Sequence, residues 1–109
     1  MKITQDLKFK NGWFIGNFEP TILKTTDFEV SHQFHPIGFI SVPHYHKVSN
    51  EYNYIVRGMI LLNHKNVLKS GDTFIYEPNE ISDVEFLEDT DMIVVRVPSA
   101  PGDKYEVWG

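Results

Sequence analysis

Short segments rich in β-branched and aromatic residues recur along the whole chain, and they constrain its fold more than any other feature. Gly, Pro, Asn or Asp separates each segment from the next, and no run of ten or more residues has a helical period. This pattern is typical of an all-β sandwich or barrel with little helix. The predicted strands are 13–15, 21–24, 28–34, 37–42, 51–57, 60–63, 66–68, 73–76, 83–87 and 92–97.

The chain length suits one domain, since 109 residues are about enough for one hydrophobic core. The net charge of -5 lacks the basic surface that nucleic acids or anionic membranes attract. With no cysteine, the chain has no disulfide, thiolate zinc site or cysteine nucleophile. Any chemistry must therefore use His, carboxylates, Tyr, Arg or a metal that they bind.

The first eight residues mix apolar with charged residues, unlike the continuous apolar region of a secretory signal. The most apolar stretch, 92–97, is far shorter than the roughly 20 residues that span a bilayer. We therefore expect a soluble, cytoplasmic protein without a membrane partner.

His44 and His46 stand at the end of a predicted strand and carry the clearest chemical signal. Because side chains alternate along a strand, both imidazoles point to one face. Glu51 opens the next predicted strand, and its carboxylate can return to the same place. Two His and one carboxylate bind a divalent first-row metal and leave positions open for water or substrate. Alternatively, the two His are ordinary polar surface residues at the end of a strand and bind no metal.

The surrounding spacing resembles the first motif of the cupin family. Five residues separate Gly38 from His44, one separates the two His, four precede Glu51, and six lie between Glu51 and Gly58. The resemblance implies a double-stranded β-helix, or jelly-roll barrel, formed by residues 1–109, with metal motifs at 38–58 and 71–87. We interpret the motif glycines as turns or close backbone contacts.

The second cupin motif is only partly present. Six residues lie between Gly71 and Pro78, where the family usually has five, and Glu80 stands at a family glycine. Asp83 occupies the position of the remaining metal-binding His. The resemblance thus implies a metal held by His44, His46, Glu51 and Asp83, with the alternative that the barrel has lost its metal.

Two His and two carboxylates suit Mn, Fe, Co, Ni or Zn. Two carboxylates inside a barrel must be paired, protonated or bound to a metal, and a divalent cation would neutralise both. Arg57 is excluded as the partner of Glu51, because six residues along a strand span roughly 20 Å. These considerations favour an occupied metal site.

We expect a small polar organic ligand in the barrel mouth, where Asn53 and Tyr76 are candidate catalytic residues. If the protein is an enzyme, isomerase-like or lyase-like chemistry is favoured over dioxygenation, because an extra carboxylate ligand leaves fewer open positions for O₂. A carbohydrate-related substrate is suggested by analogy alone. The alternatives are a non-catalytic binding or sensing module and a metal-free barrel.

Apolar residues near both ends of the chain, such as Trp13 and Trp108, must pack against other protein surface to leave water. They either cap an open end of the barrel or form a dimer face. Tyr52 and Tyr54 fall on the face opposite Glu51 and suit exterior packing or dimer contacts. Together with the open edges of the sheets, these residues predict a homodimer.

Overall fold

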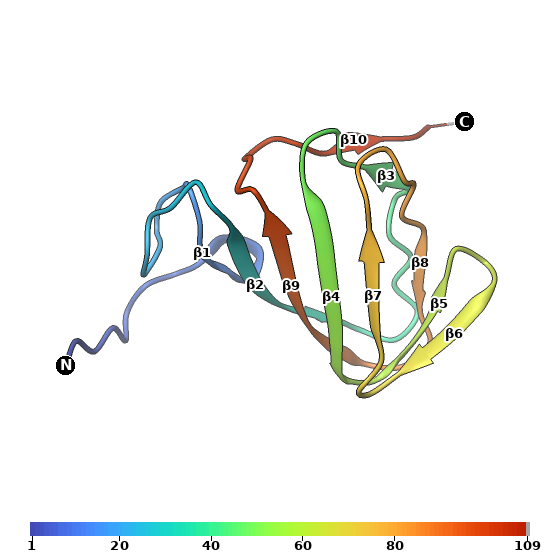
Figure 1. The fold of residues 1–109 in the computed structure, drawn as a ribbon. Coiled ribbons are helices and arrows are strands. Elements are labelled where there is room, and N and C mark those ends of the chain that lie inside the picture. The colour runs from blue at the N-terminus through green and yellow to red at the C-terminus, as the bar shows by residue number, and fades with distance from the viewer. Residues whose placement is uncertain (109) are drawn as a thin grey trace.

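The computed structural model describes residues 1–108, and almost all of its regular structure is β-strand (Figure 1). One 3₁₀ turn, η1 (Lys10–Gly12), precedes the strands. The strands are β1 (Trp13–Ile15), β2 (Glu29–His35), β3 (His44–Tyr45), β4 (Asn50–Arg57), β5 (Met59–Leu62), β6 (Asn66–Lys69), β7 (Thr73–Tyr76), β8 (Val84–Phe86), β9 (Thr90–Val97) and β10 (Tyr105–Glu106). The predicted all-β class is therefore confirmed. None of the helices in this described part is long and apolar enough to cross a membrane.

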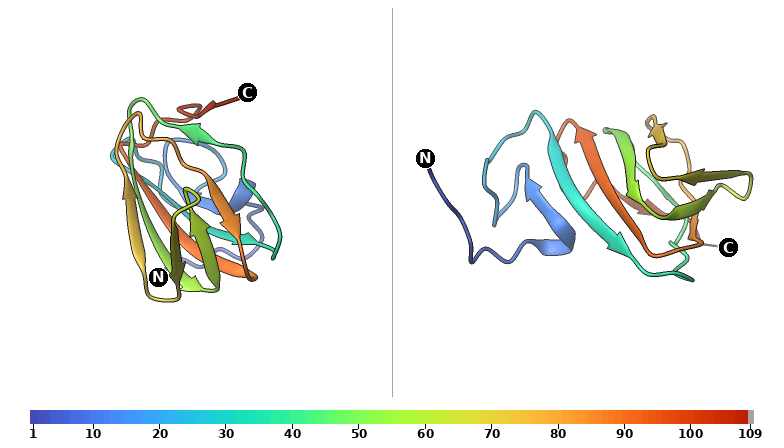
Figure 2. Two further views of the ribbon diagram at one scale, coloured as in Figure 1. Left: turned by 90° about the vertical axis from the view of Figure 1, so that its right-hand side faces the viewer. Right: turned by 90° about the horizontal axis from the view of Figure 1, so that it is seen from below.

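The strands form a large sheet and two smaller ones. The large sheet has the order β1-β2-β9-β4-β7, and the smaller sheets have the orders β6-β5-β8 and β10-β3. All of their strand pairs are antiparallel. The smaller sheets lie behind the large one in Figure 1, and Figure 2 shows the layers from the side and from below. The layers enclose the interior of a barrel.

Alternating burial along the central strands follows from the pleat of a strand. On β4, Glu51, Asn53 and Ile55 are buried and the tyrosines between them are exposed. The same alternation runs along β9. The buried apolar cluster consists of Ile55, Ile60, Val84, Phe86, Met92 and Val94.

Two predicted strands differ from the structure. Residues 21–24 make only one isolated bridge, between Leu23 and Ile15. Residues 37–42 also lack a regular strand, although Gly38 and Ser41 donate backbone hydrogen bonds to Phe86 and Val84. Both segments have strand-like composition, but bends interrupt the chain between residues 16 and 22 and a turn interrupts it at residues 37–38. β-Propensity reports how a side chain fits a sheet and does not by itself supply a partner strand.

The C-terminal segment 98–107 crosses the end of the barrel and returns as a strand. β10 pairs with β3, and Tyr105 stacks on Tyr45 with ring centroids 5.5 Å apart. Asp103 accepts hydrogen bonds from the backbone N–H groups of residues 47–49. The C-terminal segment thus pairs with β3, and Asp103 anchors the loop that follows His46.

Candidate functional site: the mouth of the barrel

β3 and the residue after it position two neutral imidazoles. His44 Nδ1 lies 3.0 Å from the carbonyl oxygen of Val42, so Nδ1 carries the proton and Nε2 keeps its lone pair. Burial lowers the pKa of His44, and the Lys104 ammonium lowers it further. Burial also lowers the pKa of His46 to about 4, with a contribution from Arg96. Both rings are therefore neutral at pH 7, with centroids 5.4 Å apart.

Glu51 on β4 is held by Arg96 on β9. The two residues are direct partners in the β4–β9 ladder, and Arg96 Nε donates to Glu51 Oε2 over 3.0 Å. The guanidinium carbon also lies 4.6 Å from the centre of the Trp13 ring. Arg96 therefore supplies the positive charge that a buried carboxylate needs.

His46 Nε2 is buried without a hydrogen-bond partner among the described residues. It lies 3.6 Å from Glu51 Oε2, which is too long for a good hydrogen bond. Buried polar atoms are usually paired, so an unpaired nitrogen beside a carboxylate is an unusual feature of this site.

Asp83 does not join these three residues. Its carboxylate lies 2.7 Å from Nε2 of His64, whose side chain is 79% exposed. Ser82 and Val84 on either side are buried, so Asp83 points outward, and Ser82 bridges to His44 instead. Side chains alternate along an extended chain, so Asp83 faces away from the side on which Ser82 and Val84 are buried. The expectation that Asp83 faces the barrel interior is thus corrected.

These positions do not fit the four-ligand metal centre that the two motifs together imply. Within residues 1–108, no three His, Asp or Glu side chains lie close enough together to hold a metal ion as they stand. Arg96 occupies one oxygen of Glu51, and Lys104 brings a second positive charge to the same lining. A divalent cation would have to compete with both.

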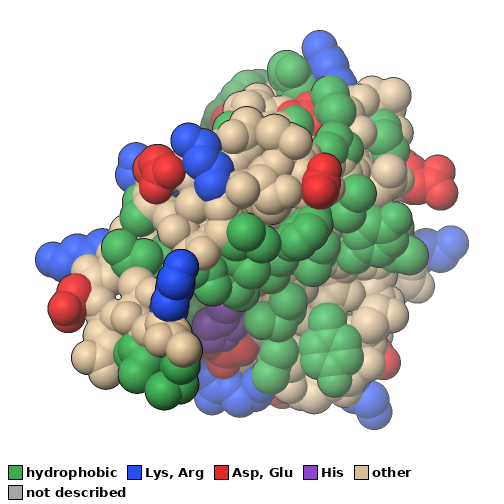
Figure 3. Space-filling model, turned by 60° about the vertical axis from the view of Figure 1, so that its left-hand side comes forward, with side chains coloured by type: hydrophobic (Ala, Val, Ile, Leu, Met, Phe, Trp, Pro, Cys, Tyr) green, Lys and Arg blue, Asp and Glu red, His purple; other side chains and the backbone are tan. Residues whose placement is uncertain are grey.

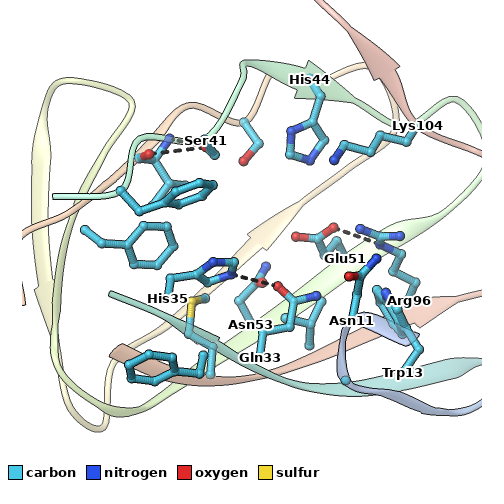
Figure 4. Close-up of a pocket in the computed structure, with 18 of the residues that line it drawn as sticks. Asn11, Trp13, Gln33, His35, Ser41, His44, Glu51, Asn53, Arg96 and Lys104 are labelled. Carbon is cyan, nitrogen blue, oxygen red and sulfur yellow. Dashed lines mark hydrogen bonds and ion pairs between the residues drawn. The ribbon is translucent and has the colours of Figure 1, made fainter. Parts of the chain in front are cut away.

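The mouth of the barrel is a pocket of about 720 Å³, within the range of small-molecule sites (Figure 4). Its polar lining comes from several separate parts of the chain and includes His44, Glu51, Asn53, Arg96 and Lys104. Figure 4 shows Glu51 and Arg96 facing the side chains of His44 and Lys104. Phe39, Phe74, Phe86, Met92 and Val94 are among its apolar lining residues.

Only one of the two candidate catalytic side chains lines this pocket. Asn53 does, and its Nδ2 makes a long 3.4 Å contact with the Phe74 carbonyl. Tyr76 is not part of the lining, and its hydroxyl donates to Asn63 Oδ1 over 2.7 Å. Burial raises the pKa of Tyr76, so this hydroxyl stays protonated as a structural donor.

Arg96 and Lys104 line the pocket although the sequence motifs do not include them. The sequence could have predicted that Arg96 points inward. It follows the buried Met92 and Val94 at two-residue steps along an apolar strand, so its side chain lies on the same face. No sequence pattern predicts the position of Lys104, because this residue follows a Pro-Gly loop whose path depends on the pairing of β10 with β3.

Comparison with known proteins supports the fold. No family model matches the chain, and no curated protein sequence matches it. Among solved structures, an uncharacterized conserved protein with a double-stranded β-helix domain from Klebsiella pneumoniae superimposes with a TM-score of 0.70 at 21% identity, covering 79% of this chain and 75% of its own. KdgF from Halomonas sp. gives a TM-score of 0.63 at 24% identity, covering 70% and 74%. A protein of unknown function with a cupin-like fold from Ralstonia eutropha gives 0.63 at 11% identity, covering 79% and 57%.

The chain thus has the double-stranded β-helix fold of the cupins, as the spacing of its first motif predicted. At these identities the similarity concerns the fold, and one fold hosts many chemistries. Function has to be argued from the pocket itself.

Proposed function

We propose that this chain is a cupin that binds a small polar organic molecule in the mouth of its barrel. One observation carries the proposal: ionisable side chains from β3, β4, β9 and the C-terminal segment converge on a single open pocket of about 720 Å³. Burial of an ionisable group costs free energy unless a partner or a bound ligand compensates its charge. Polar groups placed in a partly apolar pocket are typical of small-molecule sites.

The polar groups that reach the pocket would act as follows. His44 offers Nε2 as a proton acceptor, since its Nδ1 is committed to the Val42 carbonyl. Glu51 has a second oxygen that Arg96 does not engage. A hydroxyl or a C–H group next to a carbonyl, placed within hydrogen-bond reach of His44, could lose its proton there. Such proton transfer is the chemistry of isomerases and lyases, and the same pocket without turnover would be a binding or sensing module.

A ligand panel with a matched pair of variants tests this proposal. Sugars, polyols and hydroxy acids are screened by calorimetry against the wild type, His44→Gln and His64→Gln. His64 is the control because it lies in an exposed turn outside the pocket. We expect at least one compound to bind the wild type and His64→Gln and to bind His44→Gln about tenfold more weakly. Equal binding by all three proteins would contradict the assignment of the pocket, and conversion of the bound compound would distinguish an enzyme from a sensor.

The second candidate function is binding of the same kind of ligand with the help of a metal ion. The unpartnered Nε2 of buried His46 favours it. The donors present are His44, His46 and Glu51, so Arg96 would have to release Glu51. In addition, metal-binding His residues typically donate their other ring N–H to a carbonyl or carboxylate, as His44 does to Val42.

Elemental analysis of the untagged protein decides between the two candidates. The metal-dependent version predicts about one Mn, Fe, Co, Ni or Zn per chain, lost in His46→Ala and retained in His64→Ala. If no metal is found after incubation with each of these ions, the metal-dependent version is excluded, and the ligand proposal stands alone.

A further inference from the structure

The positive groups at the mouth keep hydrogen-bond donors that no acid within residues 1–108 engages. Arg96 uses only its Nε on Glu51, which leaves the N–H groups at the end of the guanidinium available. Within residues 1–108, the ion pairs of Lys and Arg side chains are Lys24–Glu19, Arg57–Asp91 and Arg96–Glu51, so Lys104 has no acidic partner. Both cations line the pocket.

The acidic side chains of the lining form no ion pair with Lys104 or with the terminal N–H groups of Arg96. Glu51 is already paired with Arg96, and Glu106, the other acid of the lining, lies on an exposed edge strand. The guanidinium of Arg96 also lies over the Trp13 ring, which holds its plane in place. A guanidinium held against an aromatic ring, together with an exposed ammonium on the same lining, is suited to binding carboxylate or phosphate oxygens.

The other end of the pocket is apolar and aromatic. His35 stacks on Phe39 and Phe86, with ring centroids 5.3 Å and 4.4 Å apart. Burial lowers the pKa of His35, so this ring adds no charge. Figure 4 shows His35 at a distance from Lys104, with Glu51 and Asn53 between the two ends. The pocket thus has a cationic end at the rim and an uncharged aromatic end.

From this division we infer that the ligand is an amphipathic organic anion. Its carboxylate or phosphate lies between Arg96 and Lys104, and its apolar body lies against Phe39, Phe86 and His35. The inference rests on the proposed function, because it names the ligand class and orientation for the same pocket. Binding requires both parts: the charged head gives the orientation, and burial of the apolar body contributes to affinity.

Three probes that share one apolar body test the inference: phenylbutyrate, phenylbutyl phosphate and phenylbutanol. Each is titrated into isotope-labelled protein while the indole N–H signals of Trp13 and Trp108 are followed by NMR. Trp13 lines the pocket, whereas Trp108 is 75% exposed near the C-terminus and serves as the internal reference. We expect an anionic probe to shift the Trp13 signal and to bind about tenfold more tightly than the alcohol. Whichever anion binds more tightly identifies the head group as carboxylate or phosphate.

Lys104→Met and Lys65→Met form the matched pair of variants, since Lys65 lies in the exposed turn between β5 and β6. Lys104→Met should abolish the preference for the anion, and Lys65→Met should keep it. If the alcohol binds as tightly as the anions, or if the two variants behave alike, the inference is overturned. It is also overturned if none of the three probes binds. The separate panel of sugars, polyols and hydroxy acids then decides whether the proposed function survives.

Discussion

Arg96 is the residue on which the charge balance of the pocket depends. Its partner Glu51 is only 7% exposed, and removing one member of a buried pair leaves the other charge uncompensated. Cross-strand register brings the two together, whereas Arg57, which shares the strand of Glu51, pairs with Asp91 instead. Proximity along the chain therefore says little about which cation serves Glu51.

We expect Arg96→Met to lower the free energy of unfolding by about 2 to 4 kcal/mol, because methionine keeps the contact with Trp13 but leaves Glu51 unpaired. Arg57→Met should cost much less, since the Arg57 side chain is 65% exposed and solvent screens its ion pair. Urea unfolding of both variants measures the difference. Restoration of most of the lost stability by Glu51→Gln in the Arg96→Met background would locate the cost at the unpaired carboxylate, and equal losses in the two single variants would contradict this account.

Gly58, the residue that joins β4 to β5, lies where only glycine fits. Gly58 has a φ of +113°, and a Cβ atom there would lie 2.6 Å from the carbonyl oxygen of Asp89 and even closer to Thr90 Oγ1. Gly71 also has a positive φ of +90°, but a Cβ atom at this position would meet no other atom within 4 Å. Gly58 and Gly71 thus both serve the backbone, as the sequence predicted, for partly different reasons.

Gly58→Ala should therefore cost about 3 kcal/mol or more, because the backbone of β9 must move. Gly71→Ala should cost only about 1 kcal/mol, from the left-handed conformation itself. Thermal unfolding of the two variants checks the prediction. Similar melting temperatures would show that close packing at Gly58 is not what makes this position sensitive.

The C-terminal segment is an element that stabilises the loop after His46 through Asp103. Burial alone would raise the pKa of Asp103, but three backbone N–H donors outweigh that effect and hold its pKa below the ordinary value. A carboxyl group whose pKa is lower in the folded state stabilises the fold above its unfolded pKa. That contribution is lost as the pH falls through the folded pKa.

Asp103→Asn should therefore be less stable than the wild type at pH 7, and the difference should shrink as the pH falls from about 5 towards 3. Asp27→Asn, at an exposed position, is the control and should show no such trend. Denaturant unfolding across this pH range provides the measurement. A difference that stays constant down to pH 3 would mean that the charge of Asp103 does not stabilise the loop.

At the scale of the whole molecule, the outer face of the large sheet is exposed and apolar. Tyr52, Tyr54 and Ile75 are between 43% and 57% exposed, and Val95 and Ile93 are the register partners of the two tyrosines on β9. Figure 3 shows hydrophobic side chains gathered over this side of the molecule. An exposed apolar face of this kind can pair with its own copy about a two-fold axis. The Trp13 side chain packs against the core and is not available to such a face.

The homodimer stays a prediction, and this face is where it would form. We expect the wild type to sediment as a dimer and Tyr54→Lys as a monomer, because a lysine at the centre of an apolar interface loses its hydration. Val67→Lys, on β6 of a smaller sheet, should remain dimeric. A monomeric wild type, or a dimer that survives Tyr54→Lys, would contradict this assignment.

The sequence alone determined most of the strands and most of the side chains that share a face, because period-two alternation and turn residues act over a few positions. It also predicted that His44, His46 and Glu51 lie near one another, and all three lie at the same end of the barrel, although not close enough to hold a metal ion as they stand. Only the tertiary structure decided that Arg96 pairs with Glu51, that Asp83 faces outward and that Lys104 reaches the pocket. These three outcomes depend on the register and path of distant segments, where one residue of shift reverses a face.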